Sequence, residues 1–332
     1  MRGSSPDRET LMHRFRESHG VCRVPKICAH RRKSRARRVF FVLTLCGGIW
    51  WATGALENGY AVKESDKAKR LFAARPPTLK RRNATVTLIK ASLDESYIVS
   101  LANWVRSVEH LGDETCLLID DDSYEARLRP KVRSYLNDKA YNRIRIIDVS
   151  AEFAPCSAQA KSEYCLRTKL SEEKPDGYKK MCRLWYSAVW KYLRRYDYVL
   201  RFDEDNILVH GQWPEDITYF GTVKCVPRDS ADVTVGLTEF FWNSERRHYE
   251  KYYPYTNVMF VNVQWALTDI TVQNMFRAVE DSNCICINRW GDLPLWGETL
   301  ARLGVRPRVL HGWSYVHTSH GDDVLHEEPN SC

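Results

Sequence analysis

The sequence predicts an α/β protein with a mostly parallel central sheet, preceded by one membrane-spanning helix. Three observations support this. Short apolar runs suited to buried strands alternate with segments whose apolar residues recur at helical spacing. A stretch of 18 uncharged residues follows a basic cluster near the N-terminus. The chain of 332 residues, 44% of them hydrophobic, is long enough to bury a sizeable core without cross-links.

The alternation after residue 84 places the elements in order. Strands are expected at 85–89, 116–119, 143–148 and 198–202, and helices at 97–111, from about 123 to 136, and at 178–195. The last helix is strongly amphipathic, with Asp176 as its expected N-cap. The segment 156–177 is polar and irregular, which indicates a long loop. Strands that alternate with helices form βα units, so the sheet is expected to be mainly parallel.

The net charge of +8 is confined to the N-terminal tail. Residues 1–38 carry twelve Lys and Arg against three acidic residues, a net charge of +9, which leaves −1 for the rest. The folded part therefore has no excess of positive charge, and a nucleic-acid-binding face is not expected.

Residues 39–56 are expected to be a signal anchor. They are uncharged and follow the basic run 31–38, and the positive-inside rule then keeps the N-terminus cytosolic. A cleaved signal peptide is the alternative, although such peptides begin closer to the N-terminus. We divide the chain into a cytosolic tail (1–38), an anchor (39–56), a stem (57–83) and a lumenal domain (84–332), which makes it a type II membrane protein.

Eight cysteines follow the anchor, an even number that suits disulfides in an oxidising lumen. Their pairing stays open, and some are equally compatible with buried thiols, such as Cys116 inside an apolar strand. Asn83 begins the Asn-Ala-Thr glycosylation motif, which lies on the lumenal side.

Asp203-Glu204-Asp205 is the strongest candidate for a metal site. It follows the strand expected at 198–202, and ligands of open α/β sheets bind at the carboxyl ends of strands. On extended backbone, Asp203 and Asp205 point to one side and Glu204 to the other. Carboxylates suit Mg²⁺ or Mn²⁺, and such an ion offsets the charge of a leaving diphosphate. A solvated acidic loop is the structural alternative.

Two other regions are candidates for a functional site. Asp120-Asp121-Asp122 follows the second strand, and its simplest role is to cap the next helix. The run Asn288–Glu298 concentrates tryptophan, glycine and acid, which suits a sugar site because an indole face stacks on a pyranose. A tight turn before a helix, with Asp292 as its cap, explains the same residues.

These segments together resemble one family of enzymes. The motifs are Tyr-Lys-Lys-Met-Cys-Arg at 178–183, the strand and acidic motif at 196–205, Arg-Trp-Gly-Asp-Leu-Pro at 289–294 and Tyr-Val-His at 315–317. Over roughly residues 84–318 they are similar to the fungal Kre/Mnt-type α-1,2-mannosyltransferases, glycosyltransferase family fifteen, as a divergent member. The resemblance implies a GT-A nucleotide-sugar-binding fold in the Golgi membrane, with the endoplasmic reticulum as the other candidate compartment.

The resemblance also implies a reaction and a set of residues. Mannose would pass from GDP-mannose to a glycan or glycoprotein acceptor with retention of configuration, with Mn²⁺ as cofactor. Asp203, Asp205 and His317 would hold the metal, and Asp292 and Tyr178 would be the catalytic residues beside the sugar. The nucleotide-sugar site would comprise both aspartates and the residues Lys90, Arg201, Arg289 and Trp290.

Three departures from the family pattern matter. The acidic motif is Asp-Glu-Asp where the family has Glu-Pro-Asp, and Thr318 replaces a proline. Met259 stands where the family has the glutamate proposed as nucleophile, and a thioether cannot form a glycosyl intermediate. The alternatives are a local misalignment, a front-face displacement assisted by the leaving phosphate, or an inactive Golgi protein of the same fold that binds glycans or partners.

Overall fold

The computed structural model describes residues 81–157, 159, 161–166, 174–228, 234–242, 252–288 and 290–317. The basic tail, the expected anchor and nearly all of the stem lie outside these ranges, as do Arg289 and everything after His317. Across the part of the chain that is described, no helix is both long enough and apolar enough to cross a bilayer.

A seven-stranded sheet forms the centre of the described region, in the order β10-β6-β9-β4-β1-β2-β3. Its strands are β1 (Asn83–Leu88), β2 (Glu114–Ile119), β3 (Ile144–Asp148), β4 (Tyr198–Phe202), β6 (Phe220–Thr222), β9 (Val258–Asn262) and β10 (Arg308–Val309). Neighbours are parallel except where β9 pairs antiparallel with β4 and β6. The expected mixed, mostly parallel sheet is confirmed, and the four strands expected from the sequence are β1 to β4.

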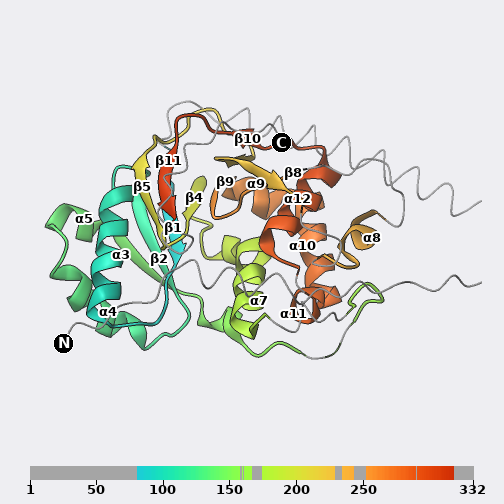
Figure 1. Ribbon diagram of the computed structural model, residues 1–332, viewed down its shortest axis with the longest axis horizontal. Coiled ribbons are helices and arrows are strands. Elements are labelled where there is room, and N and C mark those ends of the chain that lie inside the picture. Colours follow the sequence, from blue (N-terminus) through green and yellow to red (C-terminus); the bar gives the residue numbers. More distant parts are fainter. Residues whose placement is uncertain are drawn as a thin grey trace, which may run out of the picture. The chain divides into compact units, whose positions relative to one another are not determined.

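Two small antiparallel sheets and two layers of helices surround this sheet. The small sheets pair β5 (Asn206–His210) with β11 (Ser314–His317), and β7 (Cys225–Pro227) with β8 (Tyr252–Pro254). The helices are α3 (Glu95–Val108), α4 (Tyr124–Arg133), α5 (Asp138–Asn142), α7 (Asp176–Arg183), α8 (Leu237–Trp242), α9 (Val263–Thr268), α10 (Ile270–Ser282), α11 (Cys284–Ile287) and α12 (Asp292–Leu303), with the short turns η1 (Ser150–Phe153), η2 (Leu184–Ala188) and η3 (Val189–Lys191). Figure 1 shows α3 and α4 on one side of the sheet and α7, α10 and α12 on the other.

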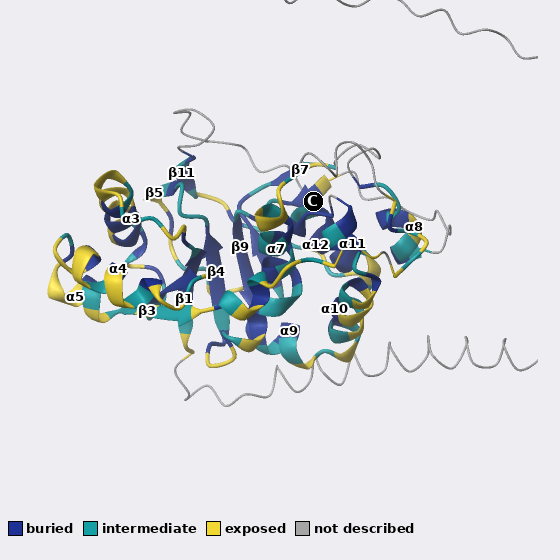
Figure 2. Ribbon diagram, turned by 90° about the horizontal axis from the view of Figure 1, so that it is seen from below, coloured by how far each residue is buried: buried dark blue, intermediate teal, exposed yellow. Residues whose placement is uncertain are grey.

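The inner strands β1, β2, β4 and β9 of the central sheet are buried on both faces, as strands of parallel sheets commonly are. In β9, Met259 and Val261 join the core under α7 and α12, whereas Val258 and Phe260 join the core under α3 and α4. Figure 2 shows β4 and β9 in the dark blue of buried residues. Side chains alternate between faces along a strand, so Arg201 of β4 points with Val199 into the layer of α7 and α12.

The expected helix at 178–195 differs from the observed one. It begins at Asp176 with Pro175 as N-cap residue, so the prediction that Asp176 is the cap is wrong. Proline holds a fixed φ and favours the extended backbone seen there, and the helix starts directly after it. The α-helix ends at Arg183 and continues as the π turn η2, a feature common near functional sites.

Two disulfides join the segment after η1 to α11. They link Cys156 to Cys286 and Cys165 to Cys284, and Cys225 is disulfide-bonded as well. The free cysteines among the described residues are Cys116 and Cys182, both of them buried. The expectation of disulfides is therefore confirmed, and so is the alternative that Cys116 is a buried thiol.

Candidate active site

The acidic motif lies at the carboxyl edge of the central sheet, in a turn between β4 and β5. The turn is anchored on both sides by backbone contacts. The Asp203 backbone N–H donates to the Asn257 carbonyl at 3.1 Å, and the Trp104 indole donates to the Asp203 carbonyl at 3.1 Å. The rigid support comes from α3 and from the loop before β9, so the carboxylates are held by elements distant in sequence.

The three acidic side chains point to three different sets of partners. Glu204 turns toward the end of β1 and the start of α3, where its carboxylate accepts from the Tyr97 hydroxyl at 2.6 Å and the Lys90 backbone N–H at 3.2 Å. The Lys90 ammonium lies 3.4 Å from the same carboxylate. Burial raises the pKa of Glu204, and these donors oppose that rise. The prediction that Glu204 faces away from its two neighbours is confirmed.

Asp203 is held by Arg201. The Arg201 guanidinium donates to both carboxylate oxygens of Asp203, at 2.7 and 3.1 Å. Another of its nitrogens donates to the Asp292 carboxylate, and the Arg201 side chain is only 3% exposed. Burial raises the pKa of Asp203 to about 6 although Arg201 lowers it, and the negative charges of Asp292 and Asp205 add to the rise. A buried arginine between two aspartates therefore links β4 to the first turn of α12.

The guanidinium of Arg201 also rests on the layer of α7. Its central carbon lies 4.5 Å above the Trp185 ring, and one nitrogen approaches the Met181 sulfur at 3.9 Å. Such a cation–π contact stabilises a desolvated arginine. Arg201 was expected near the nucleotide. Its guanidinium donates to Asp203 and Asp292 and so positions both carboxylates, and its place near the nucleotide stays a prediction.

Tyr178 and Asp292 lie together, as the resemblance implied. The Tyr178 hydroxyl is 3.4 Å from where a Cβ on Gly291 would lie, so Gly291 permits the close approach of α7 to the start of α12. The buried Cys182 thiol hydrogen bonds both the Tyr178 side chain and the Asp292 backbone, and burial raises its pKa. Gly291, not Asp292, is the N-cap residue of α12. Asp292 is therefore not the cap, and its carboxylate accepts a hydrogen bond from Arg201.

Asp205 and His317 form the pair with metal-binding character. Their nearest atoms, Asp205 Oδ2 and His317 Nε2, are 3.6 Å apart, and the His317 side chain is 6% exposed. Two atoms that bind one small divalent ion lie about 3–4 Å apart, because each is about 2.1 Å from the ion. An oxygen and an imidazole nitrogen suit Mn²⁺. Within the described ranges, no three His, Cys, Asp or Glu side chains are grouped to hold a metal.

Of three other expected site residues, only Trp290 has surroundings that differ from those predicted. Trp290 is 1% exposed, and its indole donates to the Val235 carbonyl at 2.9 Å, so its face is packed in the core and not open to a sugar. Arg289 lies outside the described residues. Asn83 is half-buried as the first residue of β1, and its glycosylation stays a prediction.

The competing acidic triplet is structural in this fold. Asp121 accepts from the backbone N–H of Ser123 at 2.9 Å and from the Ser123 hydroxyl at 2.7 Å. These bonds form a turn before α4, and both lower the pKa of Asp121. The expectation that this triplet caps the next helix is wrong, because Ser123 is the N-cap residue of α4 and no side-chain capping bond forms there.

Other residues reach the site without any signal in their local sequence. Tyr97 and Trp104 of α3 hold the acidic turn from about 100 positions away. Burial together with the charges of Asp203 and Asp205 raises the pKa of the Tyr255 phenol to about 12. The Lys224 ammonium lies 4.9 Å above the Tyr255 ring. Such contacts depend on which strands become neighbours, and periodicity alone does not contain that information.

Comparisons with known proteins indicate the fold class. No protein-family model matches the sequence, and no curated protein sequence matches it. Among solved structures, core-mannan synthase A from Aspergillus fumigatus, in a form with Mn and GDP, is similar with a TM-score of 0.52 and 14% identity, over 73% of this chain and 76% of that one. This similarity is one of fold, and the fold of the described region is GT-A-like α/β.

Two further structures match less well. Mouse xyloside xylosyltransferase 1 aligns with 8% identity and a TM-score of 0.45, over 70% of this chain and 85% of that one. A galactosyltransferase solved with donor and acceptor sugar analogs aligns with 17% identity and a TM-score of 0.36, over 66% of this chain and 70% of that one.

Proposed function

We propose that this protein is a metal-dependent retaining glycosyltransferase that transfers mannose from GDP-mannose to a glycan or glycoprotein acceptor, as a divergent relative of the Kre/Mnt-type mannosyltransferases. The observation that carries the proposal is the Asp205–His317 pair at the carboxyl edge of β4 in a GT-A-like fold. The similar mannan synthase structure holds Mn and GDP, which supports the choice of metal and nucleotide.

Asp205 and His317 would hold Mn²⁺, which supplies positive charge to the departing diphosphate. Two protein ligands suffice because substrate phosphates and water commonly complete such a site. The exposed ammonium of Lys90, beside the same turn, adds a second positive charge at the sheet edge. Asp203 would act through Arg201, since both its oxygens accept from that guanidinium.

Asp292 and Tyr178 would orient the reacting sugars. Arg201 pairs with the Asp292 carboxylate in a nearly buried position, where a carboxylate aligns sugar hydroxyls by accepting their hydrogen bonds. The Tyr178 hydroxyl lies on the same side, next to Gly291. The arrangement excludes water from the carboxylate and holds it in one direction, which favours a single sugar orientation.

Retention of configuration would follow a front-face displacement. A double displacement needs a carboxylate that attacks the anomeric carbon, and Met259 offers none. Met259 is fully buried in β9, directly opposite Arg201 of β4 and Thr222 of β6. We therefore propose that the leaving phosphate oxygen takes the proton of the incoming hydroxyl as the new bond forms on the same face.

The test compares nucleotide-sugars with the full-length protein. GDP-mannose should be hydrolysed or transferred faster than other GDP- and UDP-sugars, and only with Mn²⁺ present. Asp205→Asn and His317→Gln should each lower kcat/KM by about 100-fold or more, which corresponds to about 2.7 kcal/mol of transition-state stabilisation. Asp121→Asn is the matched control in the other acidic triplet and should leave turnover unchanged. Metal-independent turnover that survives Asp205→Asn would refute the proposed site.

A second candidate function is a catalytically inactive Golgi protein that uses the same fold to bind glycans or partners. The buried thioether of Met259 at the family's glutamate position favours it. The two functions are separated by measuring the melting temperature of the protein while GDP-mannose or a UDP-sugar is titrated into it with Mn²⁺. A folded protein whose melting temperature does not respond to any of these nucleotides supports the second candidate.

We also propose a type II topology in the Golgi membrane, with the disulfide-bonded domain in the lumen. The disulfides Cys156–Cys286 and Cys165–Cys284 support an oxidising compartment. In sealed microsomes, protease should remove only the N-terminal tail, and a glycosidase should shift the wild-type band but not that of Asn83→Gln. Digestion of the folded domain in intact microsomes would contradict this topology.

A further inference from the structure

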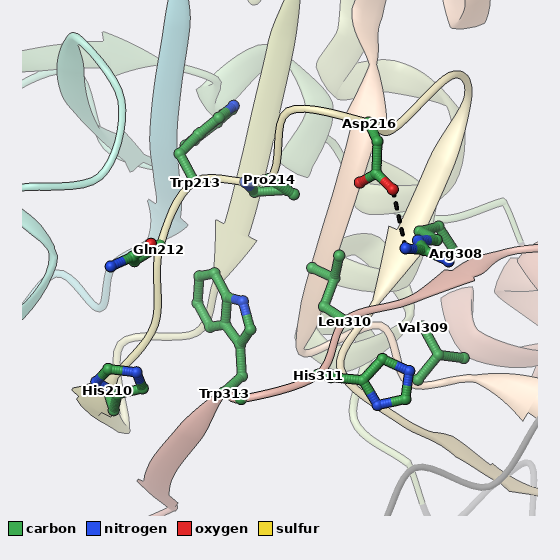
Figure 3. Close-up of a pocket in the computed structure, with 11 residues that line it drawn as sticks. His210, Gln212, Trp213, Pro214, Asp216, Arg308, Val309, Leu310, His311 and Trp313 are labelled. Atoms are coloured by element: carbon green, nitrogen blue, oxygen red, sulfur yellow. Dashed lines mark ion pairs between the residues drawn. The ribbon is translucent and has the colours of Figure 1, made fainter.

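A pocket lies at the far end of the β5–β11 ribbon from the acidic turn. It has a volume of about 350 Å³ and is formed by two segments, 210–216 and 308–313, which face each other in Figure 3. Ser314 pairs with His210 at the pocket end, whereas His317 pairs with Asn206 at the acidic end. The four residue steps along β5 separate the two ends by about 13 Å.

The aromatic wall of this pocket is held in place before any ligand binds. Trp313 packs flat against Gly211, where an added Cβ would lie only 2.8 Å from the indole. Trp313 and Trp213 both make edge contacts with Phe260, at ring separations of 5.3 and 5.4 Å. Both indoles are only half-buried, so part of each ring is available at the surface.

The rest of the lining is polar and balanced in charge. Arg308 and Asp216 form an ion pair at 2.9 Å, which Figure 3 marks, and both side chains are exposed. The side chains of His210, Gln212 and His311 are also exposed, and in the described part of the chain none of them has a hydrogen-bond partner. Imidazole and amide groups both donate and accept hydrogen bonds.

This combination identifies the class of ligand. The paired charges leave no excess that would recruit an anion, and no grouping in the described ranges suits a metal. The polar half of the lining disfavours a lipid. A sugar ring fits both halves, because its C–H face packs on an indole while its hydroxyls exchange hydrogen bonds with planar polar groups. The volume lies at the lower end of the range for ligand pockets, about 300–1,000 Å³, and suits one or two rings.

We propose that this pocket binds a sugar ring of the acceptor glycan at a position remote from the ring that reacts. The inference rests on the proposed function for the identity of the acceptor. Binding at a second point raises the effective concentration of the acceptor at the reaction centre. Oligosaccharides should therefore be better acceptors than monosaccharides, which cannot reach both ends of the ribbon.

The test measures by calorimetry how tightly the full-length protein binds α-1,2-linked mannotriose, in the absence of donor and metal. Gln212→Ala and Trp313→Phe should each weaken binding by about tenfold, equivalent to about 1.4 kcal/mol. Val209→Ala, at an exposed residue of β5 outside the pocket, is the matched control and should bind as wild type. Gln212 is exposed, so its variant folds normally even if changes at Trp313 do not.

The outcomes separate this inference from the proposed function. Mannotriose that does not bind, or that binds equally to wild type and Gln212→Ala, overturns the pocket proposal even if Mn²⁺-dependent hydrolysis of GDP-mannose is intact. Pocket-dependent binding of mannotriose by a protein that turns over no nucleotide-sugar supports the pocket and refutes the transferase.

Discussion

Replacement of Arg201 by methionine tests the buried link between β4 and α12. The side chain is 3% exposed and donates hydrogen bonds to Asp203 at 2.7 and 3.1 Å and also to Asp292. Methionine keeps much of the volume and removes the charge, so the nearly buried Asp292 carboxylate and the partly exposed Asp203 carboxylate would face each other without a cation. Breaking a buried ion pair by removal of one partner costs about 3–5 kcal/mol.

The pH dependence of this cost follows from the Asp203 carboxyl. Burial raises its pKa from 3.8 to about 6 even with Arg201 present, a change equivalent to about 3 kcal/mol. A raised folded-state pKa means that the folded protein binds the proton more tightly than the unfolded chain. The associated stability is therefore present at low pH and lost as the pH rises through the folded pKa. Without Arg201 that pKa rises further, so the variant should lose more stability at pH 8 than at pH 5.

The change in the free energy of unfolding is measured in urea with the full-length protein and a chelator. Tryptophan fluorescence reports the unfolding. Arg201→Met should lower the free energy of unfolding by about 3–5 kcal/mol at pH 8 and by roughly half of that at pH 5. Addition of Asp292→Asn should restore part of the loss. Arg145→Met, at an exposed arginine of β3, is the matched control, with an expected change within about 0.5 kcal/mol. A pH-independent loss, or none, would refute the electrostatic reasoning.

Three further predictions concern the packing around the site. Gly297→Ala should lower the free energy of unfolding by about 1–3 kcal/mol, measured in urea, because its Cβ would lie 2.0 Å from the Tyr253 ring. Burial raises the pKa of Glu152, but hydrogen bonds from its lysine and tyrosine partners outweigh this and lower it. Its stabilising effect is therefore present at neutral pH, so Glu152→Gln should cost about 1–3 kcal/mol at pH 7, and this cost should shrink as the pH falls through the lowered folded-state pKa in pH-dependent melting. Removal of the disulfide by Cys165→Ala with Cys284→Ala should cost about 2–5 kcal/mol in urea unfolding.

Each of these three has an outcome that contradicts it. Wild-type stability of Gly297→Ala would show that the Tyr253 ring moves aside at no cost. A constant difference between wild type and Glu152→Gln from pH 7 to pH 3 would exclude an ionic origin. Unchanged urea unfolding of the double cysteine variant would mean that packing and the remaining Cys156–Cys286 disulfide are enough to hold α11.

Local sequence predicted β1 to β4 and the helices α3, α4 and α7, whereas β5 to β11 and the helices α5 and α8 to α11 were not predicted. The strands β1, β2 and β4 are buried on both faces because strands inside a parallel sheet are covered on both sides. The strand β3 lies at the edge of the sheet and exposes Arg145 and Asp148. The strand before Asp203 was predicted with the bounds that the structure has, Tyr198–Phe202. The place of the acidic motif at a carboxyl edge followed from that strand alone, because a residue after a parallel strand lies at that edge wherever the strand is placed.

The tertiary structure decided which residues of the motif meet which partners. Adjacent residues in a turn point in different directions, so Asp203 met Arg201 and Asp292, Glu204 met Tyr97 and Lys90, and Asp205 met His317. The contact between Asp205 and His317 spans more than 100 positions and exists because β11 pairs with β5. Sequence periodicity specifies which face of an element is buried, but the neighbour on that face is chosen by the packing of the whole chain.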